Sequence, residues 1–121
     1  MLKFYSYANC STCKAAKKYL ESRRIAFHEI PIRETPPTPD ELHRMLKLYA
    51  GNLRRLFNTS GRDYKALGLG TRLDALSEEE ALKLLSSNGN LVKRPFVLGP
   101  KTGKVGFRAE EWEDAFSPGQ S

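Results

Sequence analysis

Short apolar runs and helical spacing alternate along the first third of the chain. Residues 2–7 combine apolar and aromatic side chains with little polarity, which predicts a strand covered on both faces. Residues 11–24 then show helical spacing, with apolar residues on one side and lysines mostly on the other. A β-favouring run follows at 25–32, before Pro36 and Pro37. We therefore expect a β-α-β unit.

Two capping boxes predict helices in the middle of the chain. In the segment 38–41, a threonine can cap the helix, a proline suits its first position and a glutamate can reach back to the cap. Gly51 is expected to end this helix. Ser77 and Glu80 form the second box, whose helix is expected to end near Gly89. Between the two, residues 53–69 are expected to form short helical pieces.

The last part of the chain returns to short apolar runs. The expected elements are extended runs at 91–92 and 96–98, a turn at 99–103, a strand at 104–107 and a helix at 109–116. The turn between two apolar runs predicts a hairpin. Trp112 and Phe116 lie four residues apart and should share one face of the last helix, while residues 118–121 are expected to fray. The predicted order is β-α-β, helices, β-β-α, in one cooperative unit.

Charge and hydropathy narrow the classes of partner. Twenty Lys and Arg against fourteen Asp and Glu give a net charge of +6, which favours anionic partners. The basic residues are scattered, without zinc-finger spacing or an RNA-binding sheet signature, so direct nucleic-acid binding is not expected. No apolar run approaches the roughly 18 residues of a membrane span, and the start lacks the apolar region of a secretory signal. We expect a cytoplasmic protein without membrane contact.

The motif Cys10-Ser11-Thr12-Cys13 falls where the first strand should meet the first helix. Unpaired N–H groups and the helix dipole at such a place lower the pKa of a thiol, and Cys10 occupies it. We therefore expect Cys10 to attack a disulfide and Cys13 to resolve the mixed disulfide by closing an intramolecular one. Lys14 and Lys17 would add weak favourable charge. In the alternative interpretation, Cys13 is only a small buried residue.

A zinc site at the cysteine pair is not expected. Tetrahedral zinc would need two further ligands, and neither His28 nor His43 lies at finger or knuckle spacing from the pair. Both histidines are expected to be structural or solvated.

Three segments together resemble the ArsC/Spx family: Asn9-Cys10-Ser11-Thr12-Cys13, Lys93-Arg94-Pro95 and Gly106-Phe107. The resemblance implies an α/β, thioredoxin/glutaredoxin-like fold (β-α-β then β-β-α) with an inserted helical subdomain. It implies a single domain whose core covers about 1–33 and 91–116, with the helical insertion at about 38–89.

The resemblance also implies a set of site residues. Pro95 would be a cis-proline facing the active-site cysteine, and Arg94 would be catalytic, holding a carboxylate or oxyanion. A surface salt bridge is the alternative role for Arg94. The further residues expected to bind substrate are Asn9, Ser11, Thr12, Lys14 and Arg108.

The family resembled includes thiol reductases, redox-sensing regulators and arsenate reductases. The leading hypothesis is a thiol-disulfide oxidoreductase with no bound cofactor, using glutathione or another small thiol as co-substrate. The second is an Spx-like regulator, in which the region of Gly51 contacts the C-terminal domain of the RNA polymerase α-subunit. Arsenate reduction is less favoured because Asn58 and Phe107 stand where two of three oxyanion-binding arginines are expected. Arg54, Arg55 or Arg108 would have to substitute for them.

Overall fold

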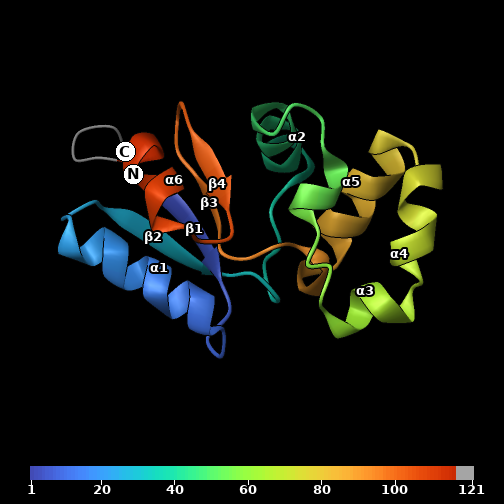
Figure 1. Cartoon of the computed structure of the whole chain (residues 1–121), viewed down its shortest axis with the longest axis horizontal. Coiled ribbons are helices and arrows are strands. Elements are labelled where there is room, and N and C mark those ends of the chain that lie inside the picture. The colour runs from blue at the N-terminus through green and yellow to red at the C-terminus, as the bar shows by residue number, and fades with distance from the viewer. Residues whose placement is uncertain (117–121) are drawn as a thin grey trace. The chain divides into compact units, whose positions relative to one another are not determined.

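The computed structural model describes residues 1–116, so the fraying expected at 118–121 lies outside the described range. The chain divides into two compact units, whose residues can be located in Figure 1 from the colour bar, which runs by residue number. The first, here called the sheet unit, joins Met1–Pro31 to the chain from Arg94 onward. The second, here called the helical unit, is Ile32–Lys93. A single cooperative domain with the boundaries given above stays a prediction.

Four strands form the sheet in the order β2-β1-β3-β4. They are β1 (Leu2–Ser6), β2 (Phe27–Pro31), β3 (Phe96–Leu98) and β4 (Gly103–Val105). The strands β1 and β2 are parallel, which requires a crossover, and α1 (Ser11–Ser22) supplies it. The strands β3 and β4 pair antiparallel as a hairpin, and β3 pairs antiparallel with β1. The predicted β-α-β unit and hairpin are confirmed.

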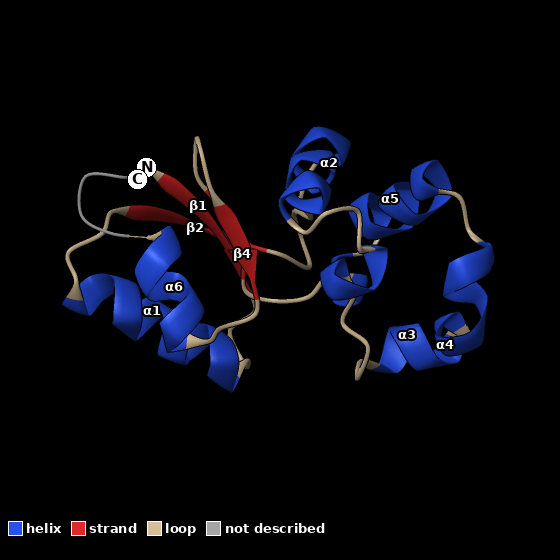
Figure 2. Cartoon of the chain, turned by 45° about the horizontal axis from the view of Figure 1, so that its top comes forward, coloured by secondary structure: helices blue, strands red, loops and turns tan. Residues whose placement is uncertain are grey.

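An apolar cluster joins the sheet to α1 and α6 (Ala109–Ala115), which lie together on one side of the sheet in Figure 2. Phe4 from β1 and Leu20 from α1 are fully buried in it. The rings of Trp112 and Phe116 lie 5.0 Å apart in an edge-to-face arrangement, which confirms that these residues share one face. The cluster fixes α1 against the sheet, and with it the helix end that carries the cysteine motif.

The helical unit is built from short helices. They are α2 (Pro39–Leu48), η1 (Leu53–Leu56), α3 (Arg62–Ala66), α4 (Leu69–Arg72), η2 (Leu73–Ala75), α5 (Glu78–Ser87) and η3 (Gly89–Leu91). Both predicted capping boxes are present: Thr38 with Glu41 opens α2, and Ser77 with Glu80 opens α5. The side-chain and backbone bonds of each box satisfy N–H groups that the helix start leaves unpaired.

Two predicted extended runs differ from the structure. Leu91 belongs to η3 and Val92 makes only an isolated bridge with Phe57, because the Asn88 side chain accepts from the Asn90 N–H and turns the chain there. The second strand begins at Phe27 rather than residue 25, since the backbone N–H of Ile25 still donates to the end of α1. Both differences arise from local capping that competes with strand pairing.

None of the helices within residues 1–116 is long and apolar enough to cross a membrane.

Candidate functional site

Cys10 is the N-cap residue of α1, directly after the turn that leaves β1. Its Sγ accepts a hydrogen bond from the backbone N–H of Cys13 at 3.3 Å, and its own N–H donates to the Tyr7 carbonyl at 3.0 Å. The sulfur therefore lies where the first N–H groups of a helix of 12 residues point outward. The N–H groups at the start of the helix can therefore donate hydrogen bonds to this sulfur. The side chain is partly exposed, so a substrate disulfide can reach it.

Cys13 lies on the buried side of α1 and is 3% exposed. Burial raises the pKa of the Cys13 thiol to about 12, and the hydrogen bond with Cys10 adds to the rise. A backbone hydrogen bond from Tyr7 and the charge of Arg94 act in the opposite direction on this pKa. Because the charge on Cys10 is among the causes of the rise, converting Cys10 into a neutral mixed disulfide should make Cys13 easier to ionise.

Arg94 and Pro95 are joined by a cis peptide bond, as the resemblance implied. The guanidinium carbon of Arg94 lies 5.1 Å from the centre of the Tyr7 ring. Its Nη1 is buried and has no hydrogen-bond partner within the described part of the chain. An unsatisfied buried donor costs about 1–3 kcal/mol, and an anionic ligand group would satisfy it.

Tyr7 links the cysteine turn to Arg94, a role that sequence reasoning missed. Its side chain is half-buried, whereas the pattern of the first strand assigns it to core packing. The Tyr7 hydroxyl accepts a hydrogen bond from Asn9 Nδ2 at 3.4 Å, while its ring lies against Arg94. The signal available in the sequence was an aromatic residue, Tyr7, placed directly after the end of the first strand and before the cysteine motif.

The other expected substrate-binding residues lie on the surface of the sheet unit. Ser11, Thr12 and Lys14 are exposed in the first turn of α1, and Asn9 is exposed just before it. Arg108 is exposed at the N-cap of α6, and its carbonyl accepts from the start of that helix. Substrate binding by these five residues stays a prediction.

Lys17, which was expected to add weak favourable charge near Cys10, is held in an ion pair on the sheet unit. Its Nζ forms an ion pair with Glu29 Oε1 at 3.0 Å, and the other oxygen of Glu29 accepts from the Ser6 hydroxyl at 2.8 Å. Sequence reasoning missed Ser6 and Glu29. A buried serine at the end of an apolar strand and a glutamate within an apolar run were the signals available.

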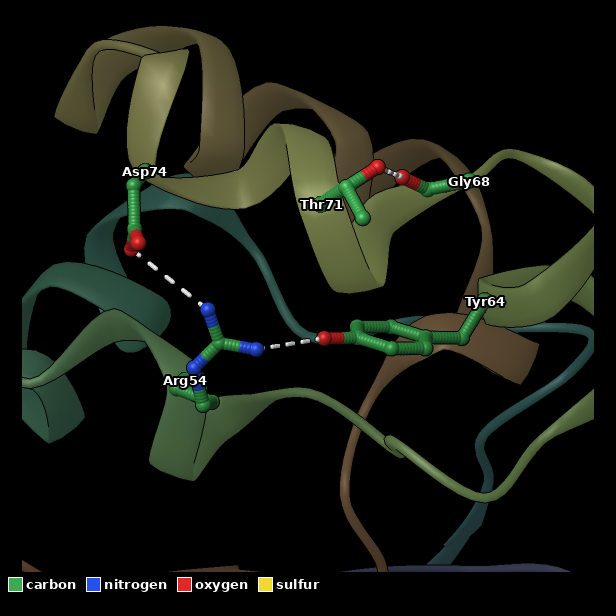
Figure 3. Close-up of polar contacts among 5 residues, drawn as sticks. All are labelled: Arg54, Tyr64, Gly68, Thr71 and Asp74. Atoms are coloured by element: carbon green, nitrogen blue, oxygen red, sulfur yellow. Dashed lines mark hydrogen bonds and ion pairs between the residues drawn. The ribbon is translucent and has the colours of Figure 1, made fainter.

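The arginines considered as substitutes in the helical unit already have partners there. Arg54 donates to the Tyr64 hydroxyl at 2.8 Å and pairs with Asp74 at 3.4 Å, as Figure 3 shows. Arg55 lies over the Tyr49 ring at 4.8 Å. Asn58 is bonded to the backbone of the 90–91 segment. Because their side chains are engaged in these contacts, Arg54 and Arg55 are less available to bind an oxyanion in place of the arginines expected at Asn58 and Phe107.

Neither histidine takes part in a recognisable site. His28 is exposed on β2, and His43 makes a surface contact with Glu78 at 3.2 Å. No group of three or more His, Cys, Asp or Glu within residues 1–116 is arranged to hold a metal ion.

The four-stranded sheet with flanking helices is a mixed α/β, thioredoxin-like fold, as predicted. The chain belongs to the ArsC family, whose model matches residues 5–115. It is 41% identical over 113 residues to the uncharacterized protein YusI of Bacillus subtilis (strain 168), covering 93% of this chain and 96% of YusI. It is 29% identical to the regulatory protein MgsR of the same organism, covering 91% and 86% of the two chains. Among solved structures, an ArsC family related protein from Bacteroides fragilis is similar with a TM-score of 0.88 and 42% identity, covering 93% of this chain and 95% of that one.

The difference between the two cysteines predicts selective alkylation. In the folded protein near pH 7, iodoacetamide should modify Cys10 and leave Cys13 unmodified, because Cys13 is buried and its raised pKa keeps it protonated. Peptide mapping by mass spectrometry after timed quenching measures both sites. Unfolding in denaturant is the control, since it should make the two cysteines react at similar rates. Equal rates in the folded protein would contradict the assigned roles.

Proposed function

We propose that this protein is a thiol-disulfide oxidoreductase in which Cys10 is the nucleophile and Cys13 the resolving cysteine. The observation that carries the proposal is the pairing of the two sulfurs across the N-terminus of α1. Cys10 Sγ is partly exposed and accepts the Cys13 N–H, while the Cys13 thiol is buried beside it. Membership of the ArsC family also supports a role based on thiol chemistry.

The proposed reaction has two steps. The Cys10 thiolate attacks the glutathione sulfur of a glutathionylated thiol, the substrate sulfur leaves as a thiolate and takes up a proton, and Cys10 becomes glutathionylated. Cys13 then loses its proton to solvent and attacks the Cys10 sulfur, which forms the Cys10–Cys13 disulfide and releases glutathione. Two further glutathione molecules reduce this disulfide and are themselves oxidised to glutathione disulfide.

Arg94 is proposed to hold the anionic end of the substrate. Its buried Nη1 has no partner within residues 1–116, and a carboxylate of glutathione would supply an acceptor with opposite charge. Tyr7 would keep the guanidinium in place through its ring, since a cation over an aromatic face is attracted to it.

Mass spectrometry of the intact protein under mild oxidant, with and without glutathione, tests the cysteine pair. We expect an internal Cys10–Cys13 disulfide, detected as a loss of two hydrogens, to be the dominant product in both conditions. A stable glutathione adduct on Cys10 as the dominant product would reduce Cys13 to a bystander. The reduced protein alkylated at Cys10 is the control, because it can form neither product.

A redox-sensing regulator of transcription is the second candidate function. It is supported by the similarity to the regulatory protein MgsR, and by the exposed Gly51, which has φ of +82° in the turn that follows α2. In this proposal the Cys10–Cys13 disulfide changes the affinity for the RNA polymerase α-subunit. Pull-down of the purified α-subunit with the oxidised and the reduced protein tests it. Absence of binding in both states would contradict it, whereas catalytic turnover would favour the first proposal.

A further inference from the structure

The Glu29 carboxylate joins three elements of the sheet unit. Glu29 lies on β2. One of its carboxylate oxygens accepts a hydrogen bond from the Ser6 hydroxyl at 2.8 Å, and the other forms an ion pair with Lys17 Nζ at 3.0 Å. Ser6 is the last residue of β1 and is only 6% exposed, whereas Lys17 lies in the middle of α1. We refer to Ser6, Lys17 and Glu29 as the Glu29 network.

Both partners of Glu29 lie next to residues that surround Cys13 in the chain or in space. The residue after Ser6 is Tyr7, whose backbone hydrogen-bonds to the Cys13 sulfur. Lys17 follows Cys13 by four residues, so the two side chains are neighbours on one side of α1. Glu29 therefore ties together the strand end that provides this hydrogen bond and the helix turn next to the sulfur.

The network is ionised at neutral pH. Partial burial acts to raise the pKa of the Glu29 carboxyl, but the bonds from Ser6 and Lys17 outweigh it and hold that pKa below its ordinary value. The same contact raises the pKa of Lys17. A carboxylate with a lowered pKa is a poor proton acceptor, so a role as general base for Cys13 is disfavoured. Both side chains are 41% exposed, and such a pair contributes little to folding by itself.

We propose that Glu29 is a positioning residue for the resolving step: through Ser6 and Lys17 it holds Cys13 in the geometry from which its sulfur attacks a mixed disulfide on Cys10. The inference rests on the proposed function, because only a resolving cysteine needs this geometry. In this step Cys13 loses its proton to solvent, the bond between the two cysteine sulfurs forms, and the thiolate attached to Cys10 leaves with the electron pair of the broken bond.

A chromogenic aromatic disulfide, a dithiobis-nitrobenzoate, releases a coloured thiolate each time its disulfide or the resulting mixed disulfide is broken. Mixed in equal amount with the reduced protein, it lets the two steps be followed separately. Attack by Cys10 releases one coloured thiolate in a phase that depends on reagent concentration. Attack by Cys13 releases the second in a phase that does not. For Glu29→Ala we expect the second phase to slow by about five- to tenfold while the first changes less than about twofold, because misplacing a reacting group mainly affects the step in which it reacts.

Conservative variants provide the controls. Glu29→Gln can still accept from Ser6 but cannot pair with the lysine, so we expect an intermediate slowing, and Lys17→Met should match it. Lys18→Met, an exposed neighbour on the same helix, changes the net charge equally and should leave both phases unchanged. These milder variants also keep the test informative if Glu29→Ala does not fold, which a thermal melt will show.

Three results would count against the inference in different ways. A second phase that is unchanged in the glutamate and Lys17→Met variants overturns the role of Glu29 and leaves the proposed function intact. Equal slowing of both phases also overturns it, since the network would then act on the whole motif. A wild-type protein that shows only the first phase overturns the proposed function together with this inference.

Discussion

Replacing Cys10 by serine is expected to abolish the reduction of a glutathionylated peptide, lowering the rate by at least roughly a thousandfold. Serine at the N-cap of α1 can still accept the Cys13 N–H, so the helix start should be preserved. The hydroxyl, however, does not supply a thiolate at neutral pH. The peptide thiol released per minute, followed by mass spectrometry with excess glutathione, measures the effect.

Cys13→Ser is the matched variant, because it keeps the nucleophile and removes only the resolving sulfur. It should react once with the peptide and then accumulate a glutathione adduct on Cys10. Residual turnover would depend on attack by a second glutathione. Full activity in Cys10→Ser would exclude Cys10 as the nucleophile, and full activity in Cys13→Ser would show that the pair is not required.

Elements with local signals were predictable from the sequence. The capping boxes at Thr38 and Ser77 each satisfy helix N–H groups within a few residues, so short-range chemistry is enough to locate the helix starts. The predicted start of the second strand of the β-α-β unit was less accurate, since the backbone N–H of Ile25 donates to the end of α1. Val92 was predicted in an extended run but makes a bridge with Phe57, a pairing that depends on contacts distant in the chain.

In the candidate site, too, features set by neighbouring residues were predictable, whereas contacts between residues distant in the sequence were not. The place of Cys10 at a strand-to-helix joint follows from periodicity on either side of it. The Lys17–Glu29 pair joins residues 12 positions apart in the sequence, and the contact between Tyr7 and Arg94 joins residues much farther apart. Nothing in the local pattern predicts such pairs, because they arise only when the parallel crossover places β2 and the cis-proline segment in the same unit as the cysteines.

Gly89→Ala is expected to destabilise the protein by about 3 kcal/mol or more, one of the larger effects for a single methyl group. A Cβ at this position would lie 1.9 Å from the Ile32 carbonyl oxygen and 2.7 Å from its carbonyl carbon. These are backbone atoms, so a rotamer change cannot relieve the overlap. The start of η3 or the segment at Ile32 must shift, and the Asn88 cap that turns the chain there would be disturbed.

Gly70→Ala is the matched control, because it places a methyl group in the same helical unit without an overlap. Its Cβ would meet only the Tyr64 ring edge at 4.0 Å, and alanine favours helix, so stability should be unchanged or rise by about 0.5–1 kcal/mol. Thermal and urea unfolding of both variants measure the two changes. Because the cysteines lie in the sheet unit, Gly89→Ala should still show preferential alkylation of Cys10 under conditions where it remains folded. A melting temperature close to that of the wild type would mean that the 32–33 backbone moves away from η3 at little cost.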